Sequence, residues 1–126
     1  MTISKKIDLI GFLISLLCAI HCGILPILLT LAPFSGLAFM ESPIVEGLIV
    51  LVSLFIAILS LSQGFTKLHK KKTPLITAIT GFTIIFICQI WANEQLETIL
   101  MVTGASAIAL AHLINWKLCE IHHKKS

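Results

Sequence analysis

The sequence predicts an all-α membrane protein, a bundle of four transmembrane helices with both termini in the cytosol. Two features of the composition indicate a membrane environment: 57% of the 126 residues are hydrophobic and only 12% are charged. A soluble domain carries about 25% charged residues, so most of this surface is expected to contact lipid. Because the gaps between the apolar segments are short, we expect a single domain over residues 1–126.

Four apolar segments are each long enough to cross about 30 Å of hydrocarbon as a helix. Backbone groups inside lipid must hydrogen-bond within their own segment, so each segment is predicted to be helical. A hydroxyl residue followed by proline is a typical helix start, and Ser42-Pro43 and Thr73-Pro74 precede the second and third segments. The predicted helices cover residues 7–31, 44–61, 75–92 and 96–118.

The orientation in the membrane follows from the nine basic residues, all of which are lysine. They precede the first segment, fill the second gap and follow the fourth segment, at positions 5, 6, 67, 70–72, 117, 124 and 125. The first and third gaps contain glutamates and no lysine. Because positive charge near transmembrane helices is retained in the cytosol, both termini and the middle loop are predicted to be cytosolic.

The first predicted helix carries small and polar residues along one face, at steps of three or four: Asp8, Gly11, Ser15, Cys18 and Cys22. The two cysteines are four residues apart, so their α-carbons lie about 6 Å from each other on a helix. Two thiolates neutralise one divalent cation, and sulfur favours soft ions such as Hg(II), Cu(I) and Cd(II), and Zn(II) less strongly. We therefore predict Cys18 and Cys22 as metal ligands with His21 beside them; packing between helices is the alternative.

A second cluster is predicted on the fourth helix, where His112, Cys119 and either His122 or His123 recur on one face. These residues are predicted as further metal ligands, with Asn115 orienting His112. The alternative is an ordinary helix end, where histidines and lysines are favourable near the C-terminus. For Cys88, in the third helix, packing in the core is favoured over a role as a third sulfur ligand.

The segment Cys18-Ala19-Ile20-His21-Cys22, followed by Pro26 in the first of four helices, resembles the MerC family of bacterial mercuric-ion transport proteins. The likeness covers the whole chain, and it places the family's intramembrane cysteine pair at Cys18 and Cys22. The family's second cysteine pair, in the cytosolic tail, is matched only in part, because this tail has Cys119 with histidines nearby. The resemblance implies a multi-pass protein of the bacterial inner membrane that transports an ion and is not an enzyme.

The expected function is uptake of a thiophilic cation by ligand exchange, from the cysteine pair through His112 to the tail cluster. Hg(II) is the expected cargo, and the histidines of the tail leave Zn(II) or Cu(I) as alternatives. The partners expected are the lipid bilayer and a cytosolic metal acceptor or reductase, with no nucleic acid and no permanent cofactor. A narrow bundle of this kind is also compatible with a homo-oligomer.

Two other functions are compatible with the same residues. One is a metal sensor of the same fold, which binds the ion without transporting it. The other is an electron-transfer protein that binds haem between His21 and His112, as four-helix membrane cytochromes do with facing histidines. Direct ligation by this pair would be awkward, since His112 is expected to lie nearer the cytosol than His21.

Overall fold

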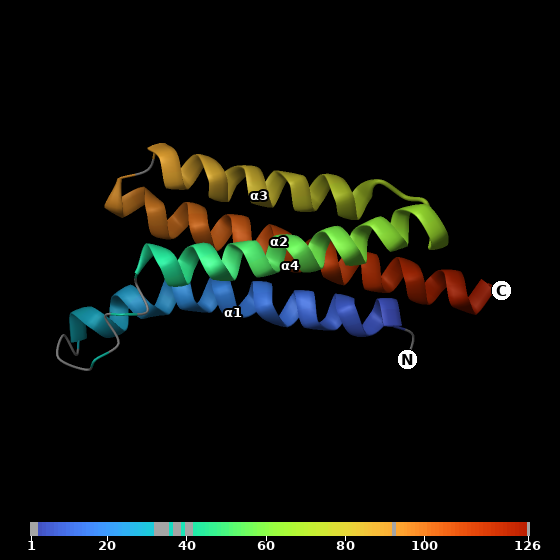
Figure 1. Ribbon diagram of the computed structural model, residues 1–126, viewed down its shortest axis with the longest axis horizontal. Coiled ribbons are helices and arrows are strands. Elements are labelled where there is room, and N and C mark those ends of the chain that lie inside the picture. The colour runs from blue at the N-terminus through green and yellow to red at the C-terminus, as the bar shows by residue number, and fades with distance from the viewer. Residues whose placement is uncertain (1–2, 32–35, 37–38, 40–41, 92, 126) are drawn as a thin grey trace.

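The computed structural model is an up-and-down bundle of four helices (Figure 1), and it describes residues 3–31, 36, 39, 42–91 and 93–125. Within the helices, the side chains at positions 3, 4, 18, 19, 22, 23, 25–27, 29, 30 and 94 lie outside the description. The elements are α1 (Ile3–Leu31), α2 (Pro43–Gln63), the π-helix η2 (Gly64–Leu68), α3 (Thr73–Trp91) and α4 (Glu94–Lys125). Every regular element in the described ranges is helical, which confirms the predicted all-α class.

The helix starts follow from local hydrogen bonds. Ser42 caps α2, because its Oγ accepts a hydrogen bond of 3.3 Å from the backbone nitrogen of Val45. Asn93 does the same for α4, where its Oδ1 accepts from the backbone nitrogen of Leu96 at 3.0 Å. The third helix begins at Thr73, and not at Pro74 as it would if Thr73 were the capping residue. The Lys72 carbonyl oxygen accepts the first helical hydrogen bond, from the backbone nitrogen of Ile76.

The fourth helix continues to Lys125, beyond the predicted end at residue 118. Its last turn contains two histidines and two lysines, which favour a helix C-terminus, and Glu120 pairs with Lys124 at 3.9 Å one turn later. With 32 residues, α4 is about 48 Å long. Because the hydrocarbon layer is about 30 Å thick, α4 is long enough to cross it and extend beyond.

One end of the bundle carries all the lysines. Figure 1 shows the two termini and the connection between α2 and α3 at the same end of the molecule. The lysines lie in the first turn of α1, in η2 and the loop after it, and in the last turns of α4. The asymmetry of charge along the sequence is therefore an asymmetry between the two ends of the bundle.

The outer surface of the bundle is apolar. Large hydrophobic side chains point outward from every helix, including Leu17 on α1, Phe55 on α2 and Phe86 on α3, each about two-thirds exposed. Within the described residues, three helical spans are long and apolar enough to cross a membrane: Pro43–Leu68, Thr73–Trp91 and Gln95–Lys125. This surface suits lipid as the surrounding solvent.

The core is organised around α4, which makes its most extensive contacts with α3 and α1, while α2 packs mainly on α1. The α3–α4 contact depends on two facing glycines. A Cβ atom on Gly81 would lie 2.7 Å from the Gly104 carbonyl oxygen, and one on Gly104 would lie 2.8 Å from the Gly81 oxygen. Such close backbone approach is typical of helix packing in membranes, where small residues form the contact.

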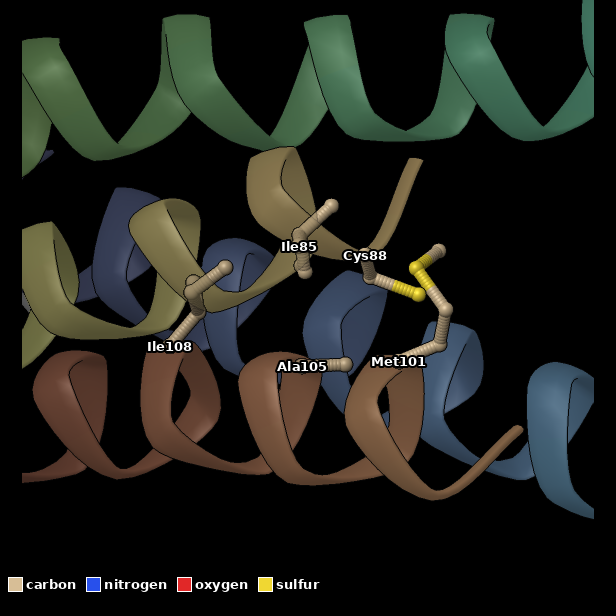
Figure 2. Close-up of a cluster of buried hydrophobic side chains, with 5 residues drawn as sticks. All are labelled: Ile85, Cys88, Met101, Ala105 and Ile108. Atoms are coloured by element: carbon tan, nitrogen blue, oxygen red, sulfur yellow. The ribbon is translucent and has the colours of Figure 1, made fainter. Parts of the chain in front are cut away.

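Next to these glycines, α3 and α4 form an apolar cluster of Ile85, Cys88, Met101, Ala105 and Ile108 (Figure 2). Cys88 is buried here, and its thiol donates a hydrogen bond to the Glu97 carbonyl oxygen at 3.5 Å. Its neighbours are apolar, so the structure supports the packing interpretation of Cys88.

Replacing Gly104 with valine should destabilise the bundle, because the new side chain would meet the Gly81 carbonyl oxygen and the side chain of Ile85. The expected loss in the free energy of unfolding is about 1–3 kcal/mol, as for other overpacked contacts. Thermal unfolding in detergent measures it. Gly47→Val is the matched control, since nothing lies within 4 Å of a Cβ atom at Gly47. Equal unfolding temperatures for the two variants would contradict the close packing of α3 on α4.

Candidate functional site

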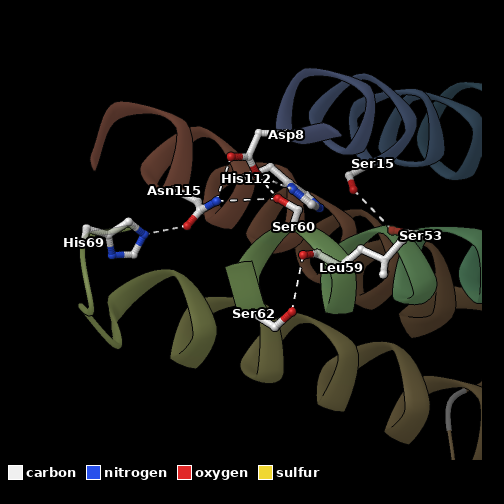
Figure 3. Close-up of polar contacts among 9 residues, drawn as sticks. All are labelled: Asp8, Ser15, Ser53, Leu59, Ser60, Ser62, His69, His112 and Asn115. Carbon is white, nitrogen blue, oxygen red and sulfur yellow. Dashed lines mark hydrogen bonds and ion pairs between the residues drawn. The ribbon is translucent and has the colours of Figure 1, made fainter. Parts of the chain in front are cut away.

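A cluster of polar side chains lies inside the bundle (Figure 3). It is near the end that carries the lysines, since Asp8 follows Lys5 and Lys6 at the start of α1. It contains Asp8 from α1, Ser60 from α2, and His112 and Asn115 from α4, and all four residues are 0% exposed. Ionisable side chains inside a membrane bundle are costly and usually mark a function. We call these four residues the Asp8 cluster.

The carboxylate of Asp8 is the acceptor at the centre of this cluster. Its Oδ1 accepts a hydrogen bond from Ser60 Oγ and lies 3.3 Å from His112 Nδ1. Its Oδ2 accepts from Asn115 Nδ2 at 2.7 Å. Both oxygens of the carboxyl group therefore have hydrogen-bond partners within the cluster. One side chain of α1 is therefore held by donors from two other helices.

Two glycines make the space that the cluster occupies. A Cβ atom on Gly11 would lie 2.6 Å from His112 Nε2 and 2.7 Å from Nδ1, so the imidazole packs directly on the backbone of α1. A Cβ atom on Gly64 would lie 2.8 Å from His69 Nε2 and would also collide with Asn115 Oδ1. Gly64 is the first residue of η2, so the π-helical turn begins where the amide of Asn115 approaches α2.

His69 connects the Asp8 cluster to the loop between η2 and α3. Its Nδ1 accepts a hydrogen bond from the Lys71 backbone nitrogen at 3.0 Å, so Nε2 carries the proton and donates to Asn115 Oδ1 at 2.7 Å. His69 could not be selected from the sequence, because its partner lies 46 positions away. Asp8 did carry a signal, as a carboxylate inside an apolar helix, although it was not selected as a site residue.

The two ring nitrogens of His112 have different surroundings. Nδ1 faces Asp8, whereas Nε2 is buried and has no hydrogen-bond partner among the described residues. The predicted partnership with Asn115 is indirect, since both side chains meet at the same carboxylate. The haem alternative, in which His21 and His112 share the ligation, stays a prediction.

The two predicted sulfur ligands in the membrane, Cys18 and Cys22, belong to α1, and their side chains lie outside the description. On the same helix face, Ser15 lies three positions before Cys18 and Gly11 seven positions before it, and both are buried. His21 is half-buried. The assignment of the cysteine pair as ligands, with His21 beside it, stays a prediction.

The tail residues separate into a buried and an exposed part. Cys119 is 0% exposed and continues the buried face of α4 that His112 and Asn115 begin. His122 and His123 are exposed, with ring centroids 6.4 Å apart. Across the described residues, no three or more His, Cys, Asp or Glu side chains are grouped so that they could hold a metal ion. Metal binding by Cys119, His122 and His123 therefore also stays a prediction.

Long apolar helices around a buried polar interior define a multi-pass helical membrane protein. The chain belongs to the MerC mercury resistance protein family, whose sequence model matches residues 8–117. This match confirms the family that the Cys-x-x-His-Cys segment indicated, and it makes the chain a membrane protein related to mercury resistance and transport. Searches of curated proteins and of solved structures find no match.

The matched range includes both cysteines of α1 and the whole Asp8 cluster, because it begins at Asp8 and ends at Lys117. Cys119, His122 and His123 follow the matched range. The Asp8 cluster is therefore within the matched range, and the end of α4 with Cys119 and the two histidines is outside it.

Replacing Asn115 with leucine should destabilise the protein, because Asp8 loses a donor and His69 loses its acceptor, both at a buried position. A buried polar group left without its partner costs about 1–3 kcal/mol. Thermal unfolding in detergent checks this, with Ser106→Leu at an exposed position of α4 as the control. An Asn115→Leu protein that unfolds at the wild-type temperature would contradict a bonded Asp8 cluster.

Proposed function

We propose that this protein carries Hg(II) inward across the bacterial inner membrane. The observation that supports this most strongly is the family match, which covers the cysteine pair of α1 and the buried polar interior together. Nothing in the proposal requires a covalent reaction on the protein, and the ion is a cargo that binds and leaves.

In this proposal all four helices cross the membrane, and both termini and the α2–α3 connection lie in the cytosol. Two observations support this topology. The end of the bundle with the termini carries every lysine, which is the charge distribution of cytosolic flanks. In addition, α1 has 29 residues, about 43 Å of helix, which is more than the hydrocarbon thickness of about 30 Å.

The path of the ion begins at the cysteine pair. Measured from Ile7 along the helix, Cys18 lies about 16 Å into the membrane and Cys22 about 22 Å. A complex of Hg(II) with two thiolates is neutral, so it avoids the cost of a charge in an apolar medium. His21 is a third ligand or a proton acceptor beside it.

From the cysteine pair the ion passes to His112 and then to the end of α4. His112 and Cys119 lie on one buried face of α4, two turns apart, with Cys119 nearer the cytosol. His122 and His123, exposed on the next turn, would present the ion to a cytosolic acceptor or reductase. Because nitrogen ligands also suit Zn(II) and copper, these ions are the alternative cargoes, and competition with Hg(II) during uptake distinguishes them.

The topology can be tested with a reporter that is active only outside the cytosol. Fused after Ser42 or Asn93, it should be active, and fused after Lys71 or Ser126 it should be silent, because lysine-rich segments are retained inside. Reporter activity in cells expressing each fusion is the measurement. An active reporter after Ser126 would be incompatible with an even number of crossings.

Cys18→Ser and Cys22→Ser should each abolish Hg(II) uptake, because one thiol can form neither the chelate nor the neutral complex. Accumulation of radioactive Hg(II) in cells expressing each variant is the measurement. Cys88→Ser is the matched control, since Cys88 is packed among apolar side chains and should keep uptake near the wild-type rate. Equal losses at all three positions would instead indicate a three-thiol site or a general packing defect.

A further inference from the structure

The imidazole of His112 contains the one buried side-chain nitrogen or oxygen that finds no hydrogen-bond partner within the described part of the chain, Nε2. A polar atom left in this state costs about 1–3 kcal/mol, and most buried polar atoms in native proteins are paired. The rest of the same ring is tightly held, by Asp8 on one side and by the backbone of Gly11 on its face. The unsatisfied atom is thus fixed in place.

The protonation of the ring follows from its partner. In the arrangement we assign, Asp8 is the acceptor for His112 as it is for Ser60 and Asn115, so His112 Nδ1 carries a proton and donates it toward Oδ1. In a neutral imidazole Nε2 then carries the lone pair. A carboxylate that holds one ring nitrogen while the other binds a cation is the usual arrangement around metal-ligating histidines.

We propose that His112 Nε2 is a ligand position for the transported soft cation in the cytosolic half of the membrane, and that Asp8 is the residue that positions it. This inference rests on the proposed transport function and assigns Asp8 a role in it. Asp8 contacts the ring and not the ion, so it acts by fixing the tautomer and orientation of His112 and by supplying a negative charge.

The charge of Asp8 matters because of what ligand exchange does. When the ion moves from a cysteine to His112, one sulfur–metal bond breaks and one nitrogen–metal bond forms. The displaced sulfur keeps its electron pair and remains at the cysteine as a thiolate with one negative charge, and the oxidation state of the metal is unchanged. The metal then carries one thiolate fewer and gains one positive charge relative to its bis-thiolate complex, which is costly in an apolar interior. The carboxylate beside the ring offsets that charge.

A small apolar cavity lies in the bundle between the ring and the cysteine pair. Figure 3 shows the imidazole of His112 extending from Asp8 toward the side where Ser15 and Ser53 lie, which are hydrogen-bonded at 3.3 Å. These two serines line a cavity of about 10 Å³ together with Ile108, which is one turn from His112 on α4. Cys18 follows Ser15 by three positions on α1, so the cavity lies between the level of His112 and the level of the cysteine pair.

The first test detects the ligand atom directly. In a protein with all four cysteines replaced by serine, nitrogen-15 NMR of the imidazoles is recorded before and after addition of Hg(II), and H112Q identifies the His112 signals. We expect a protonated Nδ1 and an unprotonated Nε2 before addition, and a shift of the Nε2 signal afterwards. An Nε2 signal that does not respond to Hg(II) overturns the inference, whatever the behaviour of the other variants.

The second test separates Asp8 from the packing of the cluster. Asp8→Asn keeps the shape of the side chain and removes its charge, whereas the matched control Ser60→Ala removes one hydrogen bond and keeps the carboxylate facing His112. In the NMR experiment, Asp8→Asn should lose the Nδ1-protonated form and weaken Hg(II) binding at Nε2 by about 10–100-fold, and Ser60→Ala should retain both. Equal effects in the two variants would indicate a structural role only and would overturn the assignment of Asp8.

Uptake by cells distinguishes a failure of this inference from a failure of the transport proposal. Relative to the wild type, H112Q and Asp8→Asn should lower the rate of Hg(II) uptake by about 10–100-fold, and Asp8→Glu should recover part of it. Cys18→Ser serves as the variant that is expected to lack uptake. Loss of uptake in Cys18→Ser, with wild-type uptake in H112Q and Asp8→Asn, overturns this inference alone. Uptake by cells with the wild-type protein that is no faster than uptake by cells without it overturns the transport proposal instead.

Discussion

The interior of this protein depends on the carboxylate of Asp8. It joins three helices, because its donors come from Ser60 on α2 and from His112 and Asn115 on α4. In a soluble protein the hydrophobic effect would bring these helices together, but in lipid that driving force is absent, and packing and polar contacts replace it. The contact between α1 and α4 therefore contains the buried polar side chains of the Asp8 cluster.

Glycines decide which contacts between helices are possible. Gly81 and Gly104 let the backbones of α3 and α4 meet, and the residues around them are apolar. Gly11 and Gly64 instead leave space for side chains, the imidazole of His112 and the amide of Asn115. The same residue type therefore produces a dry contact on one side of α4 and a polar one on the other.

The sequence predicted the four helices and the position of the charged end, because both depend on local composition. It also predicted a polar face on α1, which the buried Asp8 and Ser15 confirm. The predicted fourth segment ended at residue 118 because charged residues end the apolar stretch there, whereas the helix itself continues to Lys125, as the helical spacing of Cys119 and His122 required. The partners of Asp8 and His69 could not be predicted, because they lie between 46 and 107 positions away and depend on how the helices rotate against each other. The predicted cysteine ligands await a direct measurement of metal binding.

The distance along the chain between Asp8 and its partners has a consequence for biosynthesis. The ribosome adds about 5–20 residues per second, and the donors of α4 follow Asp8 by 104 and 107 positions. The first helix therefore waits about 5–20 s for them, and during that time its carboxylate must remain hydrated or be held by the insertion machinery. Since α4 is also the helix on which α1 and α3 pack, the bundle closes only when the last segment enters the membrane. A chain truncated before α4 would leave an acidic group without its partners on α4, in a helix that otherwise belongs in lipid.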